Sequence, residues 1–105
     1  MTPIPNAPDS KTVVTIVAAR VRWVPNTLTA PAGEVWHVQI DNQDGPPEIH
    51  NFIVASGNTF PERIYQSPNF KKGIFTFDVP ALPAGNYLFI CTVHPEVMTG
   101  SLELR

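Results

Sequence analysis

The chain has 105 residues, of which 43% are hydrophobic and 15% are charged, and its formal net charge at pH 7 is -2. This length indicates one domain, and the composition is that of a globular protein, which excludes a disordered chain. The slightly acidic balance provides no basic patch to neutralise phosphates, so we expect no nucleic-acid partner. The single cysteine excludes an internal disulfide and every metal site that needs several thiolates.

Residues 1–10 are proline-rich and polar, which predicts a flexible lead-in to a single domain over residues 11–105. No apolar run is long enough to span a membrane, and the N-terminus lacks the basic start and apolar core of a signal peptide. Association with a membrane would therefore need a segment that is absent from this chain.

Twelve prolines and six glycines divide the chain into short segments, and no window has the period of a long amphipathic helix. Alternating or β-branched segments predict strands over residues 12–19, 20–24, 28–30, 34–40, 50–55, 73–79, 86–93 and 101–104. Residues 56–70 have no clean period and predict a long connection with a short helical turn near residues 62–66. Seven or eight strands with turn signals about every 8–12 residues predict an all-β fold, a Greek-key β-sandwich.

Two predicted strands bear on the function. The alternation within residues 34–40 places His37 on the face opposite to Trp36 and Val38, so His37 is expected on the surface. Residues 86–93 are apolar on both faces, as expected of a central strand, and they lead into the only cysteine.

A short stretch near the end of the chain contains a thiol, an imidazole and a thioether. These are Cys91, His94 and Met98, spaced C-x2-H-x3-M, and a second imidazole, His50, opens a distant predicted strand. Two imidazoles, one thiolate and a weak axial thioether are the ligands of a blue-copper electron-transfer site, and they suit both Cu(I) and Cu(II). Each residue alone is typical of a core-packing or surface residue, but the four together predict one type 1 copper ion.

Zinc is the nearest chemical alternative, because it also accepts one cysteine and two histidines but has little use for a thioether. His37 or Glu48 would then be the fourth ligand, although neither has loop spacing with the others.

Four stretches carry a family resemblance, and they are Trp23 to Gly33, His50-Asn51-Phe52, Gly85 to Cys91 and Met98 to Leu102. The first is similar to an aromatic-x-Pro-x-x-Leu-x-Val-x-x-Gly pattern, and the last contains a Met-x-Gly ending. Together they resemble the cupredoxins, the blue-copper family that includes plastocyanin, amicyanin, pseudoazurin and azurin. The resemblance extends over nearly the whole chain from about Thr12 on.

The resemblance implies a cupredoxin fold with equatorial ligands His50, Cys91 and His94 and the axial ligand Met98. It also implies that Asn51, directly after the first histidine, ties the ligand-bearing loops together beside the thiolate. The three residues between His94 and Met98 form a spacer of intermediate length between those of amicyanin and plastocyanin. The resemblance therefore does not fix the copper–sulfur distance or the reduction potential.

The ligand set and the resemblance predict a one-electron carrier rather than an enzyme, since the metal would be fully coordinated and no second histidine cluster exists for oxygen chemistry. We expect a monomer that docks transiently with redox proteins near His94, within an apolar rim formed by Pro95, Val97 and Pro46-Pro47. The expected location is the periplasm or another extracytoplasmic compartment. Two alternatives stay open: a protein that stores or delivers copper, and the cupredoxin module of a larger redox protein.

Overall fold

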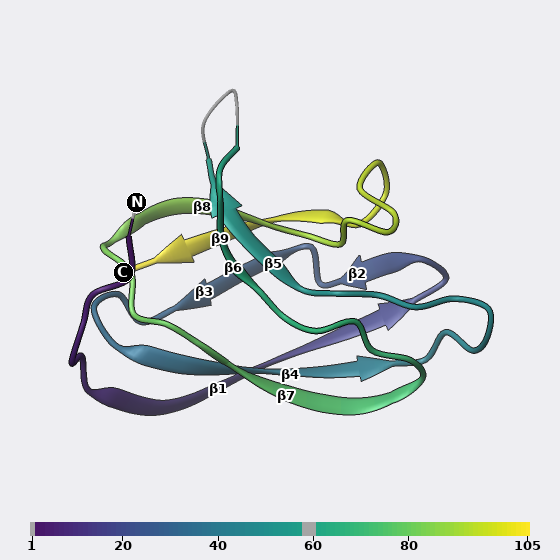
Figure 1. The fold of residues 1–105 in the computed structure, drawn as a ribbon, viewed down its shortest axis with the longest axis horizontal. Coiled ribbons are helices and arrows are strands. Elements are labelled where there is room, and N and C mark those ends of the chain that lie inside the picture. Colours follow the sequence, from purple (N-terminus) through teal and green to yellow (C-terminus); the bar gives the residue numbers. More distant parts are fainter. Residues whose placement is uncertain (1, 58–60) are drawn as a thin grey trace.

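The computed structural model of the chain describes residues 2–57 and 61–105. Within these residues nine strands form two sheets that pack face to face, as Figure 1 shows. The strands are β1 (Asp9–Ala19), β2 (Arg22–Val24), β3 (Thr27–Ala30), β4 (Val35–Asn42), β5 (Ile53–Ser56), β6 (Arg63–Gln66), β7 (Gly73–Val79), β8 (Gly85–Ile90) and β9 (Thr99–Leu104). The all-β sandwich predicted from the sequence is confirmed.

The two sheets have the strand orders β2-β1-β4-β7 and β3-β9-β8-β5-β6. The chain passes repeatedly from one sheet to the other, and the pairs β1–β4 and β3–β9 are parallel whereas the other pairs are antiparallel. β8 lies between β9 and β5, which confirms the prediction of a central strand. Among the described residues, no helix is long and apolar enough to cross a membrane.

The core lies between the sheets and is filled by the inward positions of the alternating strands. In β4 the side chains of Trp36, Val38 and Ile40 are fully buried, while His37 lies on the outer face as predicted. Phe52 and Phe89 stack with ring centroids 5.7 Å apart and form part of the same core. Burial of these large apolar surfaces is the main force that holds the two sheets together.

The short helical turn predicted near residues 62–66 is wrong. Residues 63–66 form β6, an edge strand that pairs antiparallel with β5. Ile64 and Tyr65 suit a strand, and the pairing satisfies backbone groups of β5 that a helical turn would leave open. Similarly, the strand predicted over residues 86–93 ends earlier, at Ile90, because the chain turns at Cys91.

Three connections meet at one end of the sandwich. They are the β1–β2 turn, the β4–β5 loop and the β8–β9 loop, and in Figure 1 they lie at the end opposite to the two chain termini. The β4–β5 loop contains His50, and the β8–β9 loop contains Cys91, His94 and Met98. The fold therefore carries all four predicted ligands to the same end of the molecule.

Candidate metal centre

His50 and Cys91 face each other in the interior, with the His50 Nδ1 atom 3.8 Å from Cys91 Sγ. Both residues are fully buried. His50 is fixed by paired backbone hydrogen bonds with Phe70, of 3.0 and 2.8 Å, so that the segment before β5 cannot shift independently. Cys91 follows directly after the central strand β8, which gives the thiol a rigid support.

The β8–β9 loop is a compact turn that returns on itself. His94 N donates to Cys91 O at 3.3 Å, Met98 N donates to His94 O at 3.0 Å, and Cys91 N donates to Met98 O at 3.0 Å. These bonds bring the ring of His94 against that of His50, with centroids 5.3 Å apart. The His94 side chain keeps 25% of its surface exposed, so that it connects the buried pair with the outside.

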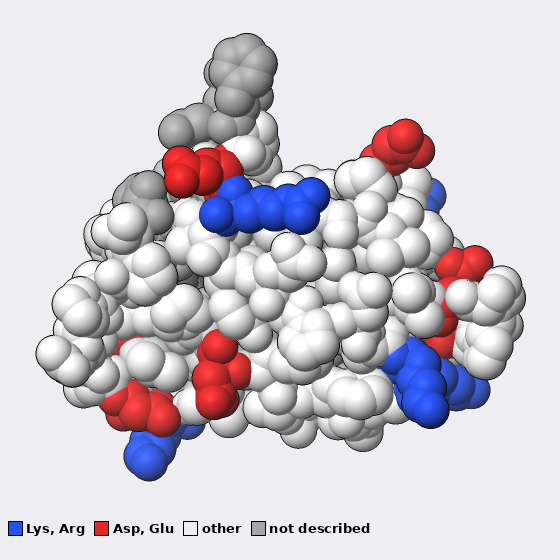
Figure 2. All heavy atoms as spheres, in the orientation of Figure 1, with Lys and Arg blue, Asp and Glu red and all other residues white. Residues whose placement is uncertain are grey.

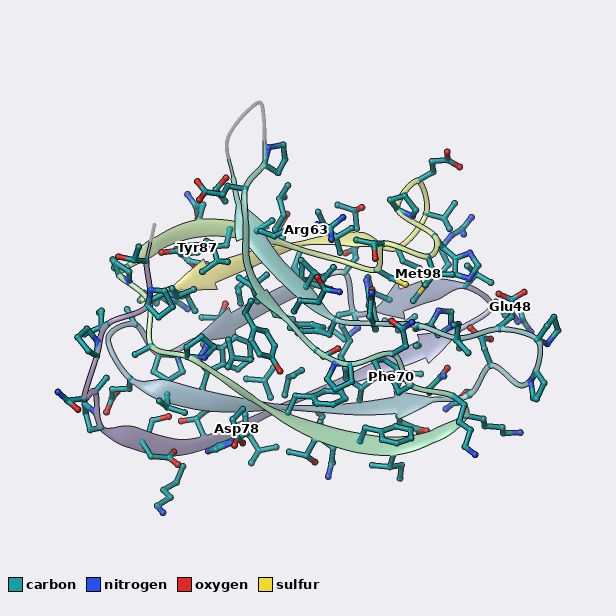
Figure 3. The ribbon with its side chains drawn as sticks, in the orientation of Figure 1. Glu48, Arg63, Phe70, Asp78, Tyr87 and Met98 are labelled. Atoms are coloured by element: carbon teal, nitrogen blue, oxygen red, sulfur yellow. The ribbon has the colours of Figure 1, made fainter. Side chains whose placement is uncertain are left out.

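Met98 is fully buried beneath this turn. Its carbonyl oxygen accepts a second hydrogen bond, of 3.1 Å, from the indole Nε1 of Trp23. Figure 3 shows Met98 at the loop end of the sandwich. In the structure Met98 lies near His50 and Cys91. The structure therefore brings the thioether to the thiol and the imidazole.

The separation of His50 Nδ1 and Cys91 Sγ fits a shared metal ion. Bonds with the lengths that zinc makes, about 2.3 Å to sulfur and 2.0–2.1 Å to nitrogen, place the two ligand atoms about 3.6–3.8 Å apart at tetrahedral to trigonal angles. The observed 3.8 Å agrees with this range. A soft thiolate and a thioether favour copper over zinc.

The described residues contain no cluster of three or more His, Cys, Asp or Glu side chains that is already arranged to hold a metal ion. His94 Nε2 approaches Glu48 Oε2 at 2.8 Å, within ion-pair distance but without the alignment of a hydrogen bond. The ligand roles of His50, Cys91, His94 and Met98 stay predictions, and the geometry that supports them most directly is the His50–Cys91 pair.

Asn51 lies between the two loops and contacts both. Its backbone N–H donates to Cys91 Sγ at 3.5 Å, and its side chain exchanges two hydrogen bonds with Thr92. A further bond of 3.3 Å joins Asn51 Nδ2 to Asn69 Oδ1. This position matches the bridging role that the resemblance implies, and the N–H at the sulfur would stabilise a thiolate.

Sequence reasoning missed Asp44, whose Oδ2 atom lies 2.9 Å from His50 Nε2. Burial alone would raise the pKa of Asp44, but hydrogen bonds from His50, Val21 and Arg20 hold it below its usual range. The available signal was a carboxylate within a short turn-forming segment six residues before a candidate ligand histidine. The pairing itself depends on how the loop folds back, which no local pattern shows.

His37 is separate from this centre. Its Nδ1 and Nε2 atoms lie 2.6 Å from Asp78 and 2.9 Å from Asp9, so that both ring nitrogens are occupied on the outer face of β4. Figure 3 shows Asp78 on the sheet that is remote from the loop containing Met98. The same contacts leave His37 unsuited to act as a fourth zinc ligand.

Comparison with known proteins identifies related folds. The family model described as the cupredoxin-like domain matches residues 2–102. Auracyanin A, a blue copper protein from Chloroflexus aurantiacus, aligns with a TM-score of 0.77 at 21% identity over 91% of this chain and 100% of its own. A variant of amicyanin aligns with a TM-score of 0.65 at 20% identity over 89% of this chain and 82% of its own.

A third structure, the copper-containing nitrite reductase of Thermus scotoductus, aligns with a TM-score of 0.64 at 22% identity. The alignment covers 88% of this chain but only 22% of the reductase. No curated protein sequence matches the chain at a significant level. At these identities, the structural likenesses establish the fold.

Proposed function

Because the chain belongs to the family of cupredoxin-like domains, we propose that it is a mononuclear copper protein that carries single electrons between redox partners. In this proposal His50, Cys91, His94 and Met98 would hold one copper ion. The observation that carries it is the buried thiol of Cys91, which faces His50 Nδ1 at 3.8 Å and receives the Asn51 N–H at 3.5 Å. When bound, copper would supply the Cu(I)/Cu(II) couple.

The surrounding residues suit electron transfer because they hold the ligands and exclude water. His50, Cys91 and Met98 are fully buried, and backbone hydrogen bonds fix the segments that carry them. A centre that keeps its shape when its charge changes has little to rearrange as the electron moves. The same burial argues against catalysis by this chain, since a substrate would have no open ligand position.

His94 is the proposed route for the electron to a partner. Three exposed apolar side chains lie on the β4–β5 and β8–β9 loops. They are Ile49 at 40%, Val93 at 40% and Val97 at 38% exposure. A small apolar rim with few charges suits a transient redox complex, which must form and separate quickly. In Figure 2 both acidic and basic side chains lie beside an uncharged surface at this end, so the docking surface has no single sign of charge.

We place the protein outside the cytoplasm, as a monomer, and this part of the proposal rests on the family alone. Two alternative functions are the delivery of copper and a role as one module of a larger redox protein. The fold shared with part of a nitrite reductase motivates the second of these.

The proposal is tested by adding Cu(II) to the purified chain and to its Cys91→Ser variant. We expect an intense visible absorption band from the thiolate–copper pair in the parent protein and its loss in the variant. Circular dichroism of both copper-free proteins provides the control that the variant is folded. Retention of the band by Cys91→Ser would show that the thiolate assignment is wrong.

A second measurement separates carriage of electrons from delivery of copper. A carrier gives reversible voltammetry and keeps its copper in the presence of a competing chelator. Rapid loss of copper to the chelator would instead support delivery.

A further inference from the structure

Asp44 joins two parts of the chain that are distant in sequence. Its Oδ1 atom accepts the backbone N–H of Arg20 at 2.8 Å, and its Oδ2 atom accepts the N–H of Val21 at 3.0 Å. The same Oδ2 atom lies 2.9 Å from Nε2 of His50. The carboxylate therefore bonds at once to the β1–β2 turn and to the buried histidine.

The β1–β2 turn has a backbone that needs such support. Arg20 and Val21 have φ angles of 54° and 57°, in the left-handed region that a β-branched residue such as valine adopts at a cost. The backbone N–H groups of both residues donate hydrogen bonds to the Asp44 carboxylate. With two fixed donors on one side, the carboxylate is held in a single orientation toward His50.

This orientation determines which ring nitrogen of His50 faces Cys91. A carboxylate oxygen can only accept here, so Nε2 would donate to Asp44 and the lone pair of the ring would be on Nδ1, which is the atom that faces Cys91 Sγ at 3.8 Å. Carboxylates in this position orient metal-binding histidines and raise their basicity in other proteins. The Asp44 side chain is only 13% exposed, so that water screens its charge weakly.

We propose that Asp44 is a positioning residue of the centre, which fixes the His50 ring with Nδ1 toward the metal and lowers the reduction potential of the copper. This inference rests on the proposed function. The sign follows from charge: a nearby buried carboxylate stabilises Cu(II) more than Cu(I). Removal of that charge therefore raises the potential.

Glu48 provides a matched comparison, because it belongs to the same loop and approaches Nε2 of the other histidine, His94, at 2.8 Å. It is 36% exposed and lacks hydrogen-bond alignment with the ring. Its charge equals that of Asp44, but its effect on the reduction potential should be weaker and should decline with added salt.

The first experiment uses the copper-free parent protein and its Asp44→Asn variant. Long-range ¹H–¹⁵N correlation spectra report which nitrogen of His50 carries the proton. We expect the Nε2–H tautomer alone in the parent protein and a mixture of tautomers in Asp44→Asn. An Nδ1–H tautomer in the parent protein would overturn the inference, whether or not copper binds.

The second experiment measures reduction potentials of the copper-loaded parent, Asp44→Asn, Glu48→Gln and Asp41→Asn. Asp41 is a control from the same region whose carboxylate contacts Gln43 at 3.2 Å. For Asp44→Asn we expect about a tenfold loss of Cu(II) affinity relative to Cu(I), which corresponds to a rise of about 59 mV. The two other variants should change the potential by less than half of that.

An unchanged or lowered potential in Asp44→Asn, or a rise no larger than that of Glu48→Gln, would overturn the inference. Absence of the thiolate–copper band in the parent protein is a different failure. It would remove the proposed function and with it the claim about the potential, while the tautomer of the copper-free protein would still decide the orientation of His50.

Discussion

Asn51 and Thr92 hold each other by two hydrogen bonds that cross between the loops of the centre. Asn51 Oδ1 accepts the backbone N–H of Thr92 at 2.9 Å, and Asn51 Nδ2 donates to Thr92 Oγ1 at 2.8 Å. Asn51 directly follows His50, and Thr92 directly follows Cys91. The pair therefore fixes the spacing of two proposed ligands through the residues beside them.

Replacement of Asn51 by alanine should destabilise the protein by about 2–4 kcal/mol, since Asn51 is 2% exposed and its loss leaves the backbone N–H and the hydroxyl oxygen of Thr92 without these partners. Urea unfolding of the copper-free protein measures the change. Asn69→Ala is the control, because it removes only the single 3.3 Å bond to Asn51 and should cost about 1 kcal/mol or less. Equal costs for the two variants would contradict the bridging role.

Gly100 allows β9 to pass close to the core beside the loop. A Cβ atom there would lie 2.2 Å from Phe89 Cζ and 2.6 Å from the backbone oxygen of Asn26. Gly100→Ala should therefore destabilise the protein by about 1–3 kcal/mol through overpacking, as seen in the urea midpoint. Gly45→Ala is the control, because a Cβ at Gly45 meets no atom within 4 Å, and a comparable loss in both variants would contradict the packing argument.

A comparison of two buried tryptophans measures how much the hydrogen bond from Trp23 to the Met98 carbonyl contributes to stability. Trp23 Nε1 donates to Met98 O at 3.1 Å, whereas Trp36 Nε1 is buried and has no hydrogen-bond partner among the described residues. Both substitutions to phenylalanine remove similar volume, but only Trp23→Phe also removes a hydrogen bond. Trp23→Phe should thus cost about 1 kcal/mol more than Trp36→Phe.

Amide hydrogen exchange in residues 91–98 gives the second readout for the tryptophan pair. Exchange should accelerate in Trp23→Phe and stay near the parent rate in Trp36→Phe, since only the first loses an anchor of the loop. Equal acceleration in both variants would mean that the indole bond does not hold the loop.

The contacts of His37 predict a dependence of stability on pH. Hydrogen bonds that the His37 ring donates to Asp9 and, to a smaller extent, to Asp78 raise the pKa of His37 above its ordinary value of 6.5. A raised folded-state pKa means that the contribution is fully present below the unfolded value and is lost as the pH rises through the folded one. The stability difference between the parent and His37→Gln should therefore shrink from mildly acidic to alkaline pH.

Chemical denaturation of both proteins at several pH values measures this difference. Asp9 sets the lower limit of the pH range in which its contact with His37 stabilises the fold. Hydrogen bonds from the Lys11 backbone and from His37 lower the pKa of Asp9 below 3.8, so that its contribution to stability is lost only in strong acid. A stability difference that does not change with pH would show that the two carboxylates do not hold a charged His37.

The sequence by itself determined the features that depend on neighbouring residues. Alternation in residues 34–40 gave the buried face of β4 and the outward position of His37, because side chains of a strand alternate between its faces. The C-x2-H-x3-M spacing restricted three proposed ligands to one loop, because covalent connection alone keeps them close. The Met-x-Gly ending placed a glycine at position 100, where the folded chain leaves no room for a Cβ atom.

Only the tertiary structure decided the contacts that join remote segments. β6 forms because β5 offers an open edge, which no period in residues 56–70 reveals. Trp23 bonds to a carbonyl 75 positions away, and Asp44 accepts a donor 24 positions away. Such pairs depend on how the sheets pack and how the loops meet at one end, and many arrangements of remote segments are compatible with the same local pattern.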